Sequence, residues 1–213
     1  MAEKTNYDIA IERVRPEFLT YDQEKMIQKF GLAHDDSYLY LRMLCRSYRI
    51  SRKSGLVEWS EDDFHTVREG GYNDTMTIYD ILCYSRDDCR LSGTFTTLSG
   101  LRYNSAFRSP DQFYQDYADY FDSRTEQLNR ACAGLEGIRL EGCDTGWQLP
   151  LFDFLPVRIQ LWNSDEEFPA SLRILWDEHI LDFMHFETTF YAAGHMLGLI
   201  RSMMEGADFD SAR

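Results

Sequence analysis

The chain has 213 residues, of which 44% are hydrophobic and 15% aromatic, and this content excludes a disordered protein because it is enough for a sizeable core. The formal net charge is −14, from 22 Lys and Arg against 36 Asp and Glu. An acidic surface repels phosphate backbones and anionic lipids, so nucleic-acid binding and membrane-surface binding are excluded as general functions.

The cysteines and the first residues predict a cytoplasmic protein with reduced thiols. The cysteine count is five, an odd number, no two cysteines form a Cys-x-x-Cys pair, and residues 1–6 contain no apolar signal core. We therefore expect no haem attachment and no zinc-ribbon or ferredoxin ligation. The identity of any cofactor stays open, and so does the choice between a monomer and a dimer.

Residues 5–31 predict helical structure. Thr20-Tyr21-Asp22-Gln23 fits a capping box, in which the Thr hydroxyl and the Gln side chain satisfy free backbone N–H groups. Gly31 is a suitable end for the helix that would follow, because glycine readily adopts the left-handed conformation of a C-terminal cap.

Residues 38–59 predict strands and contain the one basic cluster of this acidic sequence. Leu39, Leu41 and Met43 alternate with polar residues, which is typical of a half-buried strand. The basic side chains of the segment are Arg42, Arg46, Arg49, Arg52 and Lys53. Guanidinium groups match phosphates and carboxylates, so Arg42, Arg46 and Arg49 are the candidate anion-binding residues. The alternative is that they pair with the chain's own acids.

The middle of the chain predicts one short helix, one or two short strands and one long helix. Residues 75–84 are expected to be helical, and residues 91–106 to hold the short strands. Ser109-Pro110-Asp111-Gln112 is typical of a helix start, since it combines an N-cap serine with proline at the first helical position. We expect this helix to run to about Ala133, before Gly134. Residues 135–147 are predicted to be a Gly-rich connection.

A β-hairpin is predicted over residues 155–177. Val157, Ile159 and Leu161 alternate with Arg158, Gln160 and Trp162 in its first strand, and Leu172, Ile174 and Trp176 do the same in its second. The connection is acidic and ends in Pro169, which suits a turn or the start of a strand.

A buried helix is predicted over residues 187–204. Its apolar side chains recur every three or four positions, at Phe190, Ala193, Leu197, Ile200 and Met204. Residues 188–200 carry no Lys, Arg, Asp or Glu. A run of that length suits a core helix and is too short to span a membrane.

The hairpin resembles a bacterial and archaeal family known as domain of unknown function 3786. The matching residues are Leu155-Pro156, the strand ending at Trp162, Asp165-Glu166-Glu167-Phe168-Pro169-Ala170, Ile174-Leu175 and Asp177, with Leu98-Ser99-Gly100 and Ala106-Phe107-Arg108 upstream. The resemblance implies no catalytic residues, because the family has no established activity. Some relatives are fused to a four-cysteine iron–sulfur module of the kind seen with corrinoid proteins in anaerobes. This chain lacks that module.

The acidic side chains and histidines near the hairpin are the other site candidates. Asp165, Glu166, Glu167, Trp162 and Asp177 are the candidate ligand- or partner-binding residues. Carboxylates and imidazoles are ligands for divalent metals, which makes Asp177, His179 and His185 the candidate metal ligands. No standard metal-binding spacing is present, and the alternative is a solvated turn with a helix cap.

The expected fold class is α+β, with antiparallel strands and helices packed on one face, in a single domain over residues 1–213. Two halves, about 38–85 and 155–204, share the order strand, strand, helix. An internal duplication and a chance similarity explain this shared order equally well. Two functions stay open. One is a non-catalytic accessory or ligand-binding module that works with redox or cofactor-handling proteins of anaerobic metabolism, through a protein partner or a small molecule. The other is a metal-dependent enzyme that uses the carboxylates and histidines of residues 165–195.

Overall fold

The structure is a computed structural model that describes residues 5–101 and 113–206. By its internal contacts the chain divides into two compact units. Unit 1 comprises Met1–Cys89, Phe152–Phe154 and Leu181–Gly194, and unit 2 comprises Arg90–Leu151, Leu155–Ile180 and His195–Arg213. All strand pairings among the described residues are antiparallel, so the predicted α+β class is confirmed.

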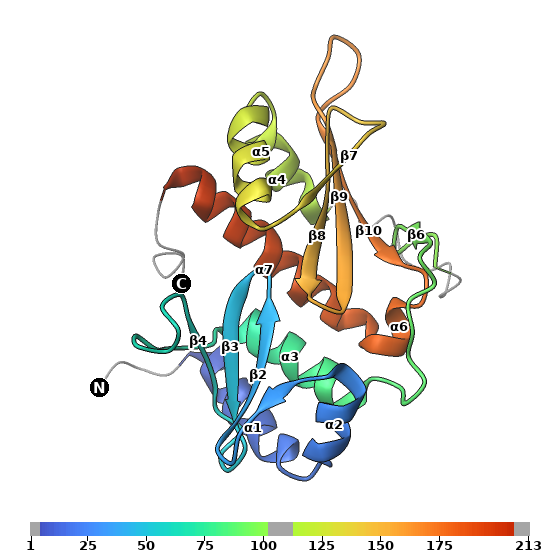
Figure 1. Cartoon of the computed structure of the whole chain (residues 1–213). Helices are drawn as coiled ribbons and strands as arrows, with labels where there is room; N and C mark the ends of the chain where they lie inside the picture. Colours follow the sequence, from blue (N-terminus) through green and yellow to red (C-terminus); the bar gives the residue numbers. More distant parts are fainter. Residues whose placement is uncertain (1–4, 102–112, 207–213) are drawn as a thin grey trace. The chain divides into compact units, whose positions relative to one another are not determined.

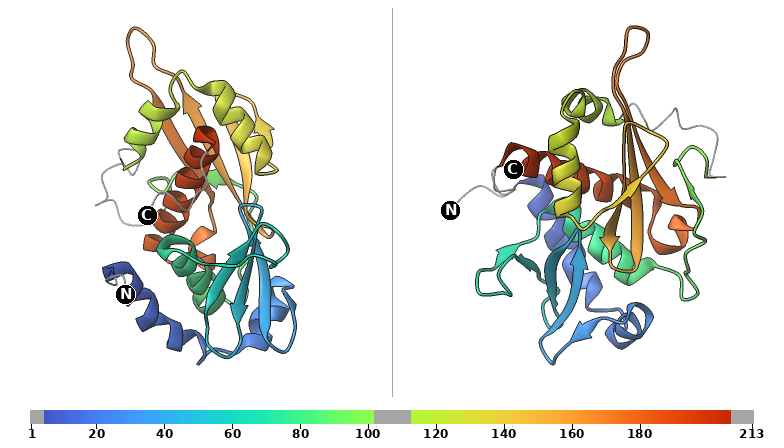
Figure 2. Two further views of the ribbon diagram at one scale, coloured as in Figure 1. Left: turned by 90° about the vertical axis from the view of Figure 1, so that its left-hand side faces the viewer. Right: turned by 45° about the horizontal axis from the view of Figure 1, so that its top comes forward.

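Unit 1 has a sheet with helices on one face (Figure 1). Its elements in chain order are α1 (Asn6–Phe18), α2 (Gln23–Phe30), β1 (Ala33–His34), β2 (Tyr38–Met43), β3 (Arg46–Ser51), β4 (Val57–Ser60), β5 (Arg68–Glu69) and α3 (Tyr72–Tyr84). The strand order is β5-β4-β3-β2, with β1 paired to β2. Figure 2 shows α1 and α3 on the same side of this sheet, and the two helices pack on each other.

The core of unit 1 follows from the alternation in its strands. Leu39, Leu41 and Met43 are buried on β2, and the residues between them are only half-buried. Ile78 and Ile81 of α3 are also fully buried. Burying a side chain of this size contributes about 1.5–3 kcal/mol, so the sheet face and the helix stabilise each other.

The turn between β2 and β3 was not expected from the sequence. Leu44 and Cys45 occupy it with φ of 50° and 63°. Two consecutive positive φ values are typical of the type I′ turn, whose twist matches that of a two-residue hairpin. Such turns normally contain Asn or Gly; here the Leu44 side chain is fully buried, which offsets part of the backbone strain.

Unit 2 is built on a second set of antiparallel strands. Its elements are β6 (Phe95–Thr96), α4 (Gln115–Phe121), α5 (Thr125–Gly134), β7 (Ile138–Leu140), β8 (Thr145–Phe152), β9 (Leu155–Trp162) and β10 (Ser171–Asp177). The strand order is β8-β9-β10-β6, with β7 paired to β8. The predicted hairpin is confirmed as β9 and β10. Strand β8 was missed, because its glycine and proline, Gly146 and Pro150, obscured the alternation of its buried residues.

Two further helices complete the chain, α6 (Ile180–Phe183) and α7 (Phe186–Glu205). The predicted final helix is confirmed as α7, with Ala193, Leu197 and Ile200 of its apolar stripe buried. No helix among the described residues is both long and apolar enough to cross a membrane.

The predicted capping box at Thr20 is wrong. The Thr20 hydroxyl donates to the carbonyl of Glu17 at the end of α1, and Asp22 is the residue that caps α2, through the backbone N–H of Lys25 at 3.1 Å. The capping box lies at the start of α1, between Thr5 and Asp8. The predicted end of α2 is confirmed, because Gly31 is left-handed with φ of 63°.

The long helix predicted from Ser109 to about Ala133 is wrong in its described part, because it is interrupted at residues 122–124. Its predicted start, Ser109-Pro110-Asp111-Gln112, lies outside the described residues. Ser123 is left-handed with φ of 60°, and the Asp122 side chain accepts hydrogen bonds from Ser164 in the β9–β10 connection. A tertiary contact therefore overrides the local helical pattern.

Two left-handed glycines of unit 1 give a matched test of close packing. A Cβ atom on Gly55 would lie 2.9 Å from the carbonyl oxygen of Arg15, whereas a Cβ on Gly31 would meet nothing within 4 Å. Gly31→Ala should cost about 1 kcal/mol of unfolding free energy, since only backbone strain is added. Gly55→Ala should cost roughly 1–3 kcal/mol more, because a backbone carbonyl must move. Urea unfolding of both variants measures the difference, and equal losses would contradict the packing.

Candidate functional site

The connection between β9 and β10 is held in shape by one carboxylate. An oxygen of Asp165, Oδ1, accepts the backbone N–H groups of Glu167 at 2.8 Å and of Phe168 at 2.7 Å. The backbone N–H of Asp165 in turn donates to the Phe168 carbonyl at 3.0 Å. A side chain that mimics a backbone turn in this way is a local stabilising motif of Asp and Asn. Residues 163–170 are called the hairpin tip below.

Two other acids of unit 2 fix the base of the hairpin tip. Asp122 accepts both the backbone N–H of Ser164, at 3.1 Å, and the Ser164 hydroxyl, at 2.6 Å. Asp144 accepts the backbone N–H of Asn163 at 2.8 Å. The Ser164 hydroxyl, followed by its N–H, holds the pKa of Asp122 below the ordinary value of a carboxyl group. The hairpin tip is therefore anchored to the residue after α4 and to the residue before β8.

The outer part of the hairpin tip presents carboxylates and one aromatic ring to solvent. Residues 164–169 are all exposed, and Phe168 has 67% of its surface accessible. In the described part of the chain, no ion pair joins Asp165, Glu166 or Glu167 to a basic side chain. Both views in Figure 2 show the connection extending beyond the other elements of unit 2.

The aromatic side chain of Trp162 lies at the end of β9, opposite Ser171 of β10. The guanidinium carbon of Arg173 sits 4.8 Å from the centre of a Trp162 ring. A cation over an indole face contributes about 0.5–1 kcal/mol at an exposed position. Of the predicted partner-binding residues, Trp162 thus belongs to the strand below the hairpin tip.

The last predicted partner-binding residue, Asp177, is fully buried and organises a loop. Its carboxylate accepts the backbone N–H groups of Ser92 at 3.0 Å, Gly93 at 2.8 Å and His179 at 2.9 Å. Burial on its own raises the pKa of Asp177, but the hydrogen bonds from His179, Ser92 and Gly93 bring that pKa below its ordinary value. All three contacts are structural, and the carboxylate faces backbone rather than solvent.

The three candidate metal ligands lie in separate surroundings. Asp177 and His179 belong to unit 2, and the Nδ1 of His179 contacts the carbonyl of Arg90 at 3.1 Å. His185 belongs to unit 1, where its Nδ1 contacts Asp80 at 2.6 Å. Within residues 5–101 and 113–206, no three His, Cys, Asp or Glu side chains are arranged to hold a metal ion. The metal site stays a prediction that no described geometry favours.

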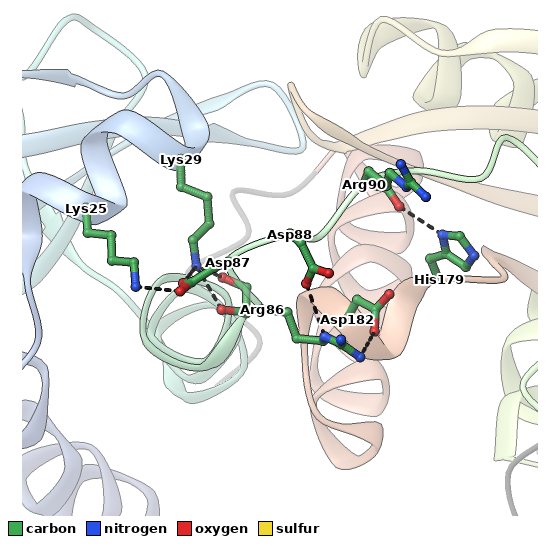
Figure 3. Close-up of polar contacts among 9 residues, drawn as sticks. Lys25, Lys29, Arg86, Asp87, Asp88, Arg90, His179 and Asp182 are labelled. Carbon is green, nitrogen blue, oxygen red and sulfur yellow. Dashed lines mark hydrogen bonds and ion pairs between the residues drawn. The ribbon is translucent and has the colours of Figure 1, made fainter.

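A charge cluster that the sequence did not reveal lies in unit 1 (Figure 3). From α2, Lys25 forms an ion pair with Asp87 at 2.6 Å, and Lys29 donates to the carbonyl of Ser85 at 2.8 Å. Arg86 pairs with Asp88 and with Asp182 of α6, both at 3.3 Å. The positive and negative charges are balanced within the cluster, so we interpret it as a set of contacts that hold the segment after α3 in place. The same figure shows the contact of His179 with Arg90.

The three candidate anion-binding arginines each have a carboxylate neighbour in their own chain. The shortest distances are 3.7 Å from Arg42 to Asp153, 3.0 Å from Arg46 to Glu61 and 2.8 Å from Arg49 to Glu58. Arg46 also stacks on Trp59, and Arg49 on Tyr38 and Phe64. An added anion would have to compete with these acids. Binding of anions there stays a prediction.

The sequence located the hairpin tip and did not locate the acids that hold it. Asp122 and Asp144 are distant in sequence from Ser164 and Asn163, so no local pattern links them. The contact between Asp80 and His185 was also missed, although Asp80 lies on the helix predicted for residues 75–84. The signal that the sequence did offer for this contact is that Asp80 is the one acid on the largely buried helix predicted for residues 75–84.

Comparison with known proteins gives one match. The family model described as "Domain of unknown function (DUF3786)" matches residues 22–198. This range includes the hairpin tip. No curated protein and no solved structure matches the chain.

The buried carboxylate of Asp177 predicts a loss of stability in acid. Because its pKa is lower in the folded state than the unfolded value of about 3.9, its contribution is fully present above that value and disappears as the pH falls through the folded pKa. Asp177→Ala should lower the unfolding free energy at pH 7 by about 3 kcal/mol, since it removes the acceptor of three part-buried backbone N–H groups.

Chemical denaturation at a series of pH values checks this expectation. The wild type should lose stability relative to Asp177→Ala as the pH falls below about 4. Parallel pH curves for the two proteins would show that the carboxylate makes no such contribution.

Proposed function

The chain belongs to the family described as domain of unknown function 3786, and within that family we propose that it is an accessory binding module whose hairpin tip engages a protein partner and has no catalytic role. The observation that carries the proposal is Phe168, a large apolar side chain with 67% of its surface exposed on a connection that is already held in shape. Aromatic anchors that enter a pocket on a partner provide much of the energy of many interfaces.

The charges beside Phe168 specify the chemistry of the partner surface. Asp165, Glu166 and Glu167 are adjacent, exposed and without an ion pair among the described residues. Like charges at this spacing repel one another, and exposed pairs would contribute at most about 1 kcal/mol to folding. A basic partner surface with an apolar recess would relieve the repulsion and accept the phenyl ring. Complementary charge would also speed association.

The internal hydrogen bonds of the hairpin tip support recognition in a second way. Asp165, Asp122 and Asp144 together order residues 163–168 in the free protein. A loop that is already ordered loses less conformational entropy when it binds. The arrangement thus supports binding with little rearrangement of the tip.

The class of partner comes from the family resemblance. Relatives that carry an iron–sulfur module point to redox or cofactor-handling proteins of anaerobic metabolism, and we propose such a protein as the partner here. The metal-dependent enzyme is the weaker candidate, because no described observation favours it. The internal duplication of residues 38–85 and 155–204 also stays a proposal.

Variants of the hairpin tip test this function. Phe168→Ser should weaken partner binding by about 30-fold, the effect of losing an anchor worth roughly 2 kcal/mol. Glu166→Gln with Glu167→Gln should weaken binding less and should reduce its dependence on salt. Asp165→Asn should leave the melting temperature nearly unchanged, because the amide retains the Oδ1 acceptor for both N–H groups.

Two control variants are compared with the variants of the hairpin tip. Ile138→Ser removes another apolar side chain of unit 2, which is 63% exposed, and Glu126→Gln with Glu141→Gln removes two exposed charges that are not part of the tip. Proteins captured from cells by the wild type are purified, and their affinities for each variant are measured by calorimetry. Equal affinity for the wild type and Phe168→Ser would contradict the proposal, as would failure of the wild type to retain any protein more than Phe168→Ser does.

A further inference from the structure

An imidazole and a buried carboxylate, those of His185 and Asp80, meet in unit 1, outside the hairpin tip. Asp80 lies in α3 with 11% of its side chain exposed, and His185 directly precedes α7 with 58% of its side chain exposed. The Nδ1 of His185 lies 2.6 Å from Oδ1 of Asp80, and the backbone N–H of His185 donates to Oδ2 at 2.7 Å. Both carboxylate oxygens of Asp80 are therefore directed at one residue.

The contact with Asp80 decides which nitrogen of the His185 ring has a lone pair free to react. A carboxylate accepts hydrogen bonds, so Nδ1 carries the proton in the neutral ring. The lone pair then lies on Nε2, the ring atom on the side away from Asp80. A carboxylate behind an imidazole also orients the ring and stabilises a positive charge that develops on it during a reaction.

A purely structural role, in which Asp80 anchors the start of α7, explains only one of the two contacts between Asp80 and His185. The bond from the His185 backbone N–H to Oδ2 would form with any residue at position 185 except proline. The ring contact with Oδ1 needs histidine, and it occupies the second oxygen of a carboxylate that is expensive to bury.

The neighbouring side chains are poorer nucleophiles than the imidazole. Burial, with contributions from Asp80 and Glu17, raises the pKa of Cys83 to about 12, so its thiol stays protonated near neutral pH. A hydrogen bond with Tyr21, then burial and Glu17, raises the pKa of Tyr84 well above its ordinary value. The Tyr84 ring packs edge-on against the His185 ring with 5.0 Å between centroids and forms one wall beside it.

We propose that His185 is a nucleophilic residue for activated acyl groups, and that Asp80 is its positioning residue. The Nε2 lone pair bonds to the acyl carbon of an ester, and the bond from that carbon to the leaving oxygen breaks, so that the alcohol or phenol leaves with the electron pair. Asp80 holds the charge that develops on the ring. Water then attacks the acyl carbon, the carboxylic acid product departs with a proton passed to solvent, and the lone pair returns to Nε2.

The test uses the full chain with p-nitrophenyl acetate as the acyl donor. Wild type should release nitrophenolate and carry an acetyl group on His185, located by mass spectrometry of peptides from a rapidly quenched reaction. His185→Gln, which retains the backbone N–H, should lower the release rate at least tenfold. His34→Gln is the matched control, because the Nδ1 of His34 contacts the uncharged carbonyl of Leu32 at 3.2 Å, and its rate should equal that of the wild type.

A second variant separates positioning from folding. Asp80→Asn should retain the backbone contact to His185 and lower acetylation of His185 about tenfold. The ¹⁵N shifts of the His185 ring should show the proton on Nδ1 in the wild type and a mixture of tautomers in Asp80→Asn. An unchanged release rate in His185→Gln, or acetylation of His34 as fast as that of His185, would overturn the proposal.

Discussion

The register of β9 against β10 is the constraint on which the candidate site depends. Ile174 lies opposite Ile159 and Leu172 opposite Leu161, so both strands direct their apolar side chains to the same face. A shift of one residue would expose that entire set and bury Arg158 and Gln160 in its place. Because the register is fixed by burial, with Trp162 opposite Ser171, the same acidic residues always form the connection. The hydrogen bonds that its backbone donates to Asp122 and Asp144 then fix its direction.

The acidity of the chain has two different physical roles. Asp80, Asp122, Asp165 and Asp177 each accept backbone N–H groups, so their charges are compensated where they stand. Glu166 and Glu167 have no comparable partner in the described part of the chain, and they flank an exposed phenyl ring. Net charge alone therefore says little about where the chain could recognise a partner. The recognition that we propose depends instead on where exposed carboxylates without an ion pair lie beside an exposed apolar side chain.

The sequence predicted the elements whose burial follows a simple period. The β9–β10 hairpin, the helix α7 and the left-handed cap at Gly31 are confirmed, since alternation, helical spacing and glycine chemistry each act locally. The turn at Leu44 and Cys45 was missed because apolar residues occupy positions that normally favour Asn and Gly. The interruption at residues 122–124 was missed because its cause is a contact with Ser164, which lies far along the chain. For the same reason the contacts of Asp177 with Gly93 and of His185 with Asp80 could not be predicted from the sequence.

Footprinting of the complex tests recognition by the hairpin tip most directly. Hydrogen exchange is measured on the chain alone and with its purified partner, and peptides covering residues 163–170 are compared with the rest of unit 2. Recognition through Phe168 and its neighbouring acids predicts protection at those residues, together with the β9 and β10 positions next to them. Protection elsewhere in the chain, with exchange at residues 163–170 unchanged, would contradict it.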